Sequence, residues 1–199
     1  MSSQQLMRWG GLAAVVAGAL RTVASFWPAA EPSTALEILY LVIDLLILFG
    51  ILGIYGFQSD RIGPSGFIGF LLGVIGTAII AGPDGTIGMV NMYALGSLSL
   101  GVGLVFLAVA SWRARTLPRW VAILWVVSTT MGILGSAAAL PGLFVIAGVT
   151  FGVAFIGAGL RVRSEIGPRN SEQRTAISER RVSKGSQRSR GCGRRCRPD

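Results

Sequence analysis

The sequence of 199 residues contains no histidine, and its two cysteines, Cys192 and Cys196, both lie near the C-terminus. The lack of histidine excludes Ser-His and Cys-His nucleophile pairs, HExxH zinc sites and bis-histidine haem ligation. Two cysteines supply two ligands, which do not complete a tetrahedral zinc site. We therefore expect no catalytic residues of these kinds, no metal and no cofactor.

Charged residues are also scarce, because they make up 14% of the chain while hydrophobic residues make up 52%. A soluble domain of this size needs more charge to cover its surface, so the composition indicates a chain that has lipid as its solvent. The charge is uneven: residues 161–199 hold twelve basic and four acidic residues, while residues 1–160 hold six and five. This division predicts a transmembrane domain over 1–160 and a separate basic tail over 161–199.

Six apolar runs are long enough to cross a hydrocarbon core of about 30 Å as helices. They cover residues 9–27, 36–56, 66–82, 88–110, 120–139 and 142–160. Each run is too long and too continuously apolar for a strand of a membrane barrel. The predicted fold class is an all-α membrane protein with six transmembrane helices and a disordered C-terminal tail, which is rich in Arg, Ser and Gly.

The positions of the arginines predict the orientation of these spans. With both ends in the cytoplasm, every cytoplasmic connection carries arginine, whereas the outer segments 28–35, 83–87 and 140–141 contain no Lys or Arg. Four of the five tryptophans also fall at span ends, as in an aromatic belt. We expect a multi-pass protein of the inner (plasma) membrane. Seventeen of the eighteen basic residues are Arg, which indicates a GC-rich and therefore bacterial genome.

A similar sequence follows the second, fourth and sixth predicted spans. These sequences are Arg61-Ile62-Gly63-Pro64, Arg115-Thr116-Leu117-Pro118 and Glu165-Ile166-Gly167-Pro168. Their regular spacing predicts three successive αα-hairpins that face the same way across the membrane. The alternative is that membrane loops are commonly rich in Pro and Gly.

Small residues are spaced to place them on helix faces. Gly66, Gly69, Gly73 and Gly76 share one face of the third predicted helix, and Gly148 and Gly152 lie one turn apart on the sixth. Glycine lets helix backbones approach closely inside a membrane. We favour packing within the chain over a homodimer face or a glycine-lined pore.

Two ionisable residues lie well inside predicted spans, Arg21 in the first and Asp44 in the second. Both sit roughly 9–12 Å below the outer surface at 1.5 Å per residue, so mutual pairing would reduce the cost of burying them. Glu37 and Tyr40 share a helix face with Asp44. We favour a structural ion pair over a polar path for a proton, a cation or an anionic headgroup.

The basic tail is expected to adsorb to anionic lipid headgroups, because each basic residue near such a surface contributes about 1 kcal/mol. The residues chosen for this contact are Arg161, Arg163, Arg180, Arg181, Arg194 and Arg195. Nucleic acid is not favoured as a partner, because no stacking aromatics accompany the charge. The expected partners are the lipid bilayer, a second copy of the chain or a membrane partner subunit.

Three stretches carry a resemblance to known sequences: Arg8-Trp9-Gly10-Gly11, the run from Glu37 to Asp44, and the run from Gly66 to Gly73. Together they resemble a type of small six-helix bacterial membrane protein that has no assigned activity. The resemblance implies six helices over residues 8–160 and supplies no activity that could be assigned to this chain.

The functional hypothesis is a non-catalytic membrane protein with an accessory or membrane-structural role. One alternative is a small transporter or channel that uses Arg21, Asp44, Glu37 and Tyr40. A membrane enzyme that acts on lipid is the third possibility, and the missing catalytic groups argue against it.

Overall fold

The structure, a computed structural model, describes residues 3–27, 34–82, 86–87, 90–138 and 140–165. Within these residues the chain forms five helices and one short β-hairpin. The helices are α1 (Ser3–Ala24), α2 (Thr34–Ile80), α3 (Met92–Ala114), α4 (Arg119–Ala138) and a C-terminal helix (Pro141–Glu165), and the strands are β1 (Thr86–Ile87) and β2 (Val90–Asn91). The chain divides into two units, Met1–Arg163 and Ser164–Asp199.

Four of the described helices are long and apolar enough to cross a membrane: α2, α3, α4 and the C-terminal helix. The helix α1, which carries Arg8 and Arg21, is not among them. The described residues therefore confirm the all-helical class, and the four apolar helices indicate a membrane protein. The number of six spans and their grouping into three hairpins stay predictions.

The helix α2 is 47 residues long and is interrupted at Gly63, where the backbone takes φ 60° and ψ −166°. Pro64 lacks an N–H and disfavours helical geometry in the residue before it, so the helical bonding pattern breaks here. The two halves of α2 then fold back on each other. The ring of Tyr55 stacks on that of Phe70 with centroids 4.1 Å apart, whereas fifteen residues of straight helix would separate them by about 22 Å.

The α3 helix begins later than predicted, at Met92, because β2 pairs with β1 immediately before it. The Asn91 side chain caps the helix by accepting a hydrogen bond of 3.0 Å from the N–H of Ala94. Asparagine is among the preferred residues at this position. The cap explains a polar residue close to the start of an apolar helix.

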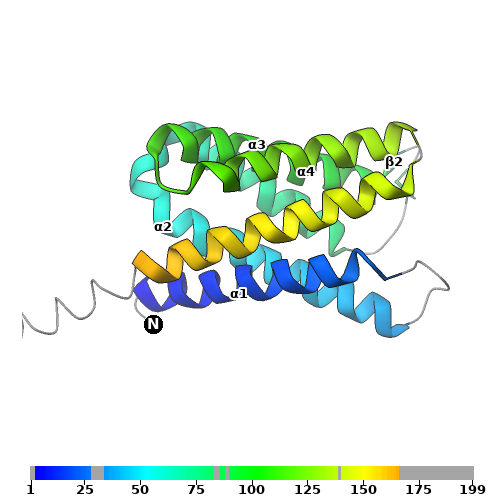
Figure 1. The fold of residues 1–199 in the computed structure, drawn as a ribbon, viewed down its shortest axis with the longest axis horizontal. Helices are drawn as coiled ribbons and strands as arrows, with labels where there is room; N and C mark the ends of the chain where they lie inside the picture. The colour runs from blue at the N-terminus through cyan, green and yellow to red at the C-terminus, as the bar shows by residue number, and fades with distance from the viewer. Residues whose placement is uncertain (1–2, 28–33, 83–85, 88–89, 139, 166–199) are drawn as a thin grey trace, which may run out of the picture. The chain divides into compact units, whose positions relative to one another are not determined.

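The helix α1 packs between the first half of α2 and the C-terminal helix. On one side, a Cβ added to Gly10 would lie 2.9 Å from the carbonyl oxygen of Phe49. On the other side, a Cβ added to Gly11 would lie 3.2 Å from the carbonyl oxygen of Gly159. Figure 1 shows α1 in blue beside the C-terminal helix in yellow and orange.

The C-terminal helix also contacts α4, and this pair contributes large buried side chains to the core. Trp125 of α4 meets Phe155 edge to face with ring centroids 5.9 Å apart, and both are fully buried. The C-terminal helix continues to Glu165, past the boundary predicted at residue 160, because Val162 is fully buried and holds its last turns on the bundle. Residues 161–165 are therefore helical and not part of a disordered tail.

Candidate functional site

Arg21 and Tyr40 bring α1 and α2 together at one polar cluster. The guanidinium carbon of Arg21 lies 5.8 Å from the centre of the Tyr40 ring, within the range of a cation–π interaction. Asp44 is one helical turn further along α2 and is attracted electrostatically to Arg21. Among the described residues no direct ion pair joins Arg21 to Asp44, and the role predicted for these two residues stays a prediction.

The C-terminal helix closes this cluster with a glycine. A Cβ added to Gly148 would lie 3.9 Å from the Nε atom of Arg21 and would collide with the side chain of Ser25. Glycine at this position therefore leaves room for the arginine. Glu37 is exposed in the first turn of α2, so the structure gathers Arg21, Tyr40, Asp44 and Gly148 but leaves Glu37 at the rim.

The predicted packing glycines lie at contacts within the chain. A Cβ added to Gly69 would lie 2.7 Å from the backbone nitrogen of Leu107, and one added to Gly76 would lie 2.7 Å from the carbonyl oxygen of Gly96. Both contacts join the second half of α2 to α3. Gly152 faces Gly18 and Thr22 of α1, Gly73 faces Ile51, and Gly66 meets the side chain of Ile62.

A buried polar cluster that was not predicted from the sequence joins α2 to the end of α3. Gln58 is fully buried, and its Oε1 accepts hydrogen bonds of 2.7 Å from the hydroxyls of Ser111 and Thr116. The Nε2 atom of Gln58 has no hydrogen-bond partner within the described part of the chain. A glutamine that directly follows a long apolar run was the only sequence signal for this cluster.

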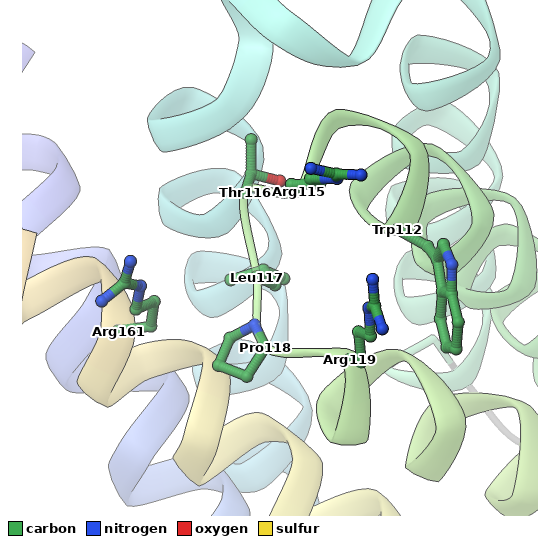
Figure 2. A pocket seen from close by; sticks show the side chains of 7 residues that line it. All are labelled: Trp112, Arg115, Thr116, Leu117, Pro118, Arg119 and Arg161. Carbon is green, nitrogen blue, oxygen red and sulfur yellow. The ribbon is translucent and has the colours of Figure 1, made fainter.

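A basic pocket of about 290 Å³ lies at the same end of the helices, around the connection between α3 and α4. Among the described residues it is lined by Trp112, Arg115, Thr116, Leu117, Pro118, Arg119 and Arg161, and none of these is acidic. Figure 2 shows Arg119 beside the ring of Trp112, Arg115 next to Thr116, and Arg161 on the C-terminal helix on the other side of Leu117 and Pro118. The guanidinium carbon of Arg119 lies 5.8 Å from the centre of the Trp112 ring.

The predicted lipid-contact residues are divided by the structure. Arg161 lines the basic pocket, and Arg163 lies on the C-terminal helix with its Cγ near Gly11 of α1. Arg180, Arg181, Arg194 and Arg195 lie outside the described residues. Arg115 and Arg119 were not predicted as binding residues, because the sequence of a loop does not show that Arg161 lines the same pocket.

A second hollow of about 370 Å³ lies between α3 and α4 and is almost wholly apolar. It is lined by Ala108, Val109, Trp112, Arg113, Ala122, Ile123, Val126 and Val127. Trp112 belongs to both hollows, so the apolar groove begins where the basic pocket ends.

Among the described residues, no group of three or more His, Cys, Asp or Glu side chains could hold a metal ion. Comparisons with protein families, with curated protein sequences and with solved structures found no match. The fold of the described residues therefore defines the class of the protein: it is helical, with four helices that are long and apolar enough to cross a membrane.

Proposed function

We propose that the chain is a non-catalytic, multi-pass membrane protein that crosses the inner membrane six times. The observation that carries this proposal is the exposure of large apolar side chains on the outer surface of the bundle. Inside the bundle, helices approach one another at glycine residues. The exposed set includes Phe49, Leu52, Ile75, Phe106, Val109, Ile123 and Val153. Such a surface is stable in lipid and would aggregate in water.

The break in α2 supports the proposed number of six spans. Residues 64–80 extend for about 26 Å and residues 34–62 for about 44 Å at 1.5 Å per residue, so each half reaches across most or all of a bilayer core. We assign the remaining span to the helix α1. Its two arginines do not exclude this, because Arg8 lies near the start of the helix and Arg21 lies beside Tyr40. The successive pairs are then α1 with the first half of α2, the second half of α2 with α3, and α4 with the C-terminal helix.

The distribution of arginine supports a cytoplasmic placement of one end of the bundle. The contacts of Gly11 with Arg163, of Gln58 with Thr116 and of Gly157 with Trp120 place four chain segments at the same end. The described arginines of that end are Arg8, Arg61, Arg113, Arg115, Arg119, Arg161 and Arg163. Arg21 is the described arginine of the opposite half, and the positive-inside rule favours the crowded end as cytoplasmic.

The absence of a catalytic role is supported by how the hydroxyl groups of the helices are used. Thr22, Thr77 and Thr150 donate to carbonyl oxygens one turn earlier in their own helices, at 2.8 Å each. Ser99 donates to Leu72 and Ser128 to Ala147 across helix contacts. Hydroxyls occupied in this way satisfy the backbone and fix packing.

The topology is tested by labelling single cysteines in a chain whose Cys192 and Cys196 are replaced by serine. We expect a membrane-impermeant maleimide to label Thr86→Cys in intact cells and Ser59→Cys only after permeabilisation. Labelling of both positions from outside would refute the break at Gly63 as a cytoplasmic turn. The reverse pattern would refute the orientation.

A transporter is the second candidate function, and one observation favours it. Arg21, Tyr40 and Asp44 form a half-buried polar cluster, which is costly inside a membrane and therefore often functional. Proton flux in liposomes tests it: transport should be lost in Asp44→Asn and kept in Asp60→Asn, which changes an exposed carboxylate elsewhere in α2. Equal flux with and without the wild-type protein would favour an accessory or membrane-structural role.

A further inference from the structure

The basic pocket has the chemistry of an anion site. Arg115 and Arg119 line it from the connection between α3 and α4, and Arg161 lines it from the C-terminal helix on the other side of Leu117 and Pro118 (Figure 2). Guanidinium groups match the geometry of phosphate oxygens and bind them through paired hydrogen bonds. The helix α4 begins at Arg119, so the partial positive charge of its N-terminus adds to the site.

Arg115, which lines this pocket, has an unfavourable backbone conformation. It has φ 53° and ψ 32°, and among the described residues it is the only non-glycine residue with a positive φ. Its N–H bonds the carbonyl of Trp112, and the N–H of Thr116 bonds that of Ser111. This is a Schellman ending, in which the left-handed position is usually glycine. The chain keeps an arginine where glycine would be unstrained.

The apolar groove adds a second requirement on the ligand. It runs between α3 and α4 and its walls are alanine, valine and isoleucine, with Trp112 and Arg113 at the basic end. A free phosphate or a nucleotide would leave this groove unused. A ligand with a phosphate at one end and a hydrocarbon chain at the other fills both hollows.

We propose that the basic pocket and the adjoining groove together bind one anionic glycerophospholipid. The headgroup phosphate lies between Arg115 and Arg119, and one acyl chain lies along Val109, Ile123 and Val126. Trp112 separates the charged from the apolar part, as indole rings do at the edge of a bilayer. The inference rests on the proposed membrane placement of the bundle.

The test counts the lipids that the purified full-length chain retains by native mass spectrometry after exposure to equal amounts of phosphatidylglycerol and phosphatidylcholine. We expect one phosphatidylglycerol to be retained in preference to phosphatidylcholine. The double variant Arg115→Gln with Arg119→Gln should bind it roughly thirtyfold more weakly. The matched control, Arg8→Gln with Arg61→Gln, removes the same charge from exposed positions at the same end and should bind as the wild type does.

A second pair of variants tests the groove. Val126→Trp fills it and should weaken retention about tenfold, because one indole replaces the contacts of the acyl chain. Ile133→Trp adds the same ring at an exposed position of α4 outside the groove and should leave retention unchanged.

Three outcomes would overturn the proposal. Equal losses in the two arginine double variants would show general attraction to charge. Displacement of phosphatidylglycerol by an equal concentration of glycerol 3-phosphate would show a free-anion site. Full retention in Val126→Trp would show that no acyl chain occupies the groove. Membrane fractionation of each variant separates these outcomes from failure of the proposed function, because an inserted chain that holds no lipid refutes only the lipid site.

Discussion

Two of the described residues have backbone conformations that L-amino acids with a side chain rarely adopt. Gly63 turns α2 back on itself with φ 60° and ψ −166°, a region that is almost exclusive to glycine. Arg115 ends α3 in the left-handed region, which costs arginine roughly 1–2 kcal/mol. Gly63 is a residue type that adopts its backbone conformation without strain, whereas Arg115 is not. Substitutions at the two sites should therefore have opposite effects on stability.

Replacing Gly63 by alanine should lower the free energy of unfolding by about 1–3 kcal/mol. No atom lies within 4 Å of a Cβ added at Gly63, so the cost comes from the backbone conformation and not from a clash. Thermal unfolding in detergent, followed by circular dichroism, measures the change. The matched control is Gly132→Ala in α4, where a Cβ is equally free of contacts and alanine favours the helix. An equal loss in both variants would contradict the prediction.

Replacing Arg115 by glycine should raise the free energy of unfolding by about 1 kcal/mol, because glycine adopts the left-handed conformation without strain. The comparison is Arg115→Gln, which also removes the guanidinium but keeps a Cβ and therefore the strain. We expect the glycine variant to melt at a higher temperature than the glutamine variant. If the two variants melt alike, the left-handed conformation of Arg115 is not a cost to the fold.

At the scale of the elements, glycine decides how closely the helices approach. The second half of α2 and α3 meet backbone to backbone at Gly69, Gly76 and Gly103. Between the same two helices, the hydroxyl of Ser99 donates a hydrogen bond of 3.0 Å to the carbonyl oxygen of Leu72. Helix association in lipid relies on such packing and interhelical hydrogen bonds, because the hydrophobic effect does not separate helix from lipid tails.

Replacing Gly103 by alanine should separate α2 from α3 and lower the free energy of unfolding by about 1–3 kcal/mol. The new Cβ would lie 2.7 Å from the carbonyl oxygen of Gly69 and 2.5 Å from the nitrogen of Gly73, and neither backbone atom can move alone. Resistance to unfolding by SDS measures the loss. Gly132→Ala again serves as the control on a helix surface without contacts, and unchanged resistance in Gly103→Ala would contradict this packing.

At the scale of the whole molecule, the two ends of the bundle differ in chemistry. One end holds seven of the eight described arginines, the Gln58 cluster and the basic pocket, while the other holds the Arg21 cluster, the β-hairpin and Glu37. This asymmetry supports one orientation in the membrane. It also separates the two candidate sites, so that variants of one should leave the other intact.

A chain that ends after Glu165 should insert into membranes and unfold at the same temperature as the full chain. The physical reason is that the first unit closes at Arg163 with its own buried side chains. Its adsorption to anionic vesicles should weaken, because residues 166–199 carry ten of the eighteen basic residues. Membrane fractionation, thermal unfolding and vesicle sedimentation measure these three properties. A truncated chain that fails to insert would show that the tail belongs to the folding unit.

Hydrophobic length and turn chemistry in the sequence predicted most of the helices. Apolar runs of membrane length correspond to α3, α4 and the C-terminal helix, and Gly63-Pro64 marked the reversal inside α2. The helix ends were less well predicted, because they depend on contacts: the pairing of β2 with β1 delays α3, and the buried Val162 extends the last helix. The glycine positions were predicted as packing residues, but their partners were not.

The sequence by itself predicted helices of membrane length and an orientation for them, because hydrophobic runs and the one-sided distribution of arginine are properties of residue order. Only the tertiary structure decided which polar groups meet. It placed Arg21 over Tyr40, and it joined Gln58 to Ser111 and Thr116, which are more than fifty residues away. It also brought Arg161 to the same pocket as Arg115 and Arg119. The physical reason is that helix length follows from local hydrophobicity, whereas the neighbours of a side chain follow from how closely glycine lets separate helices pack.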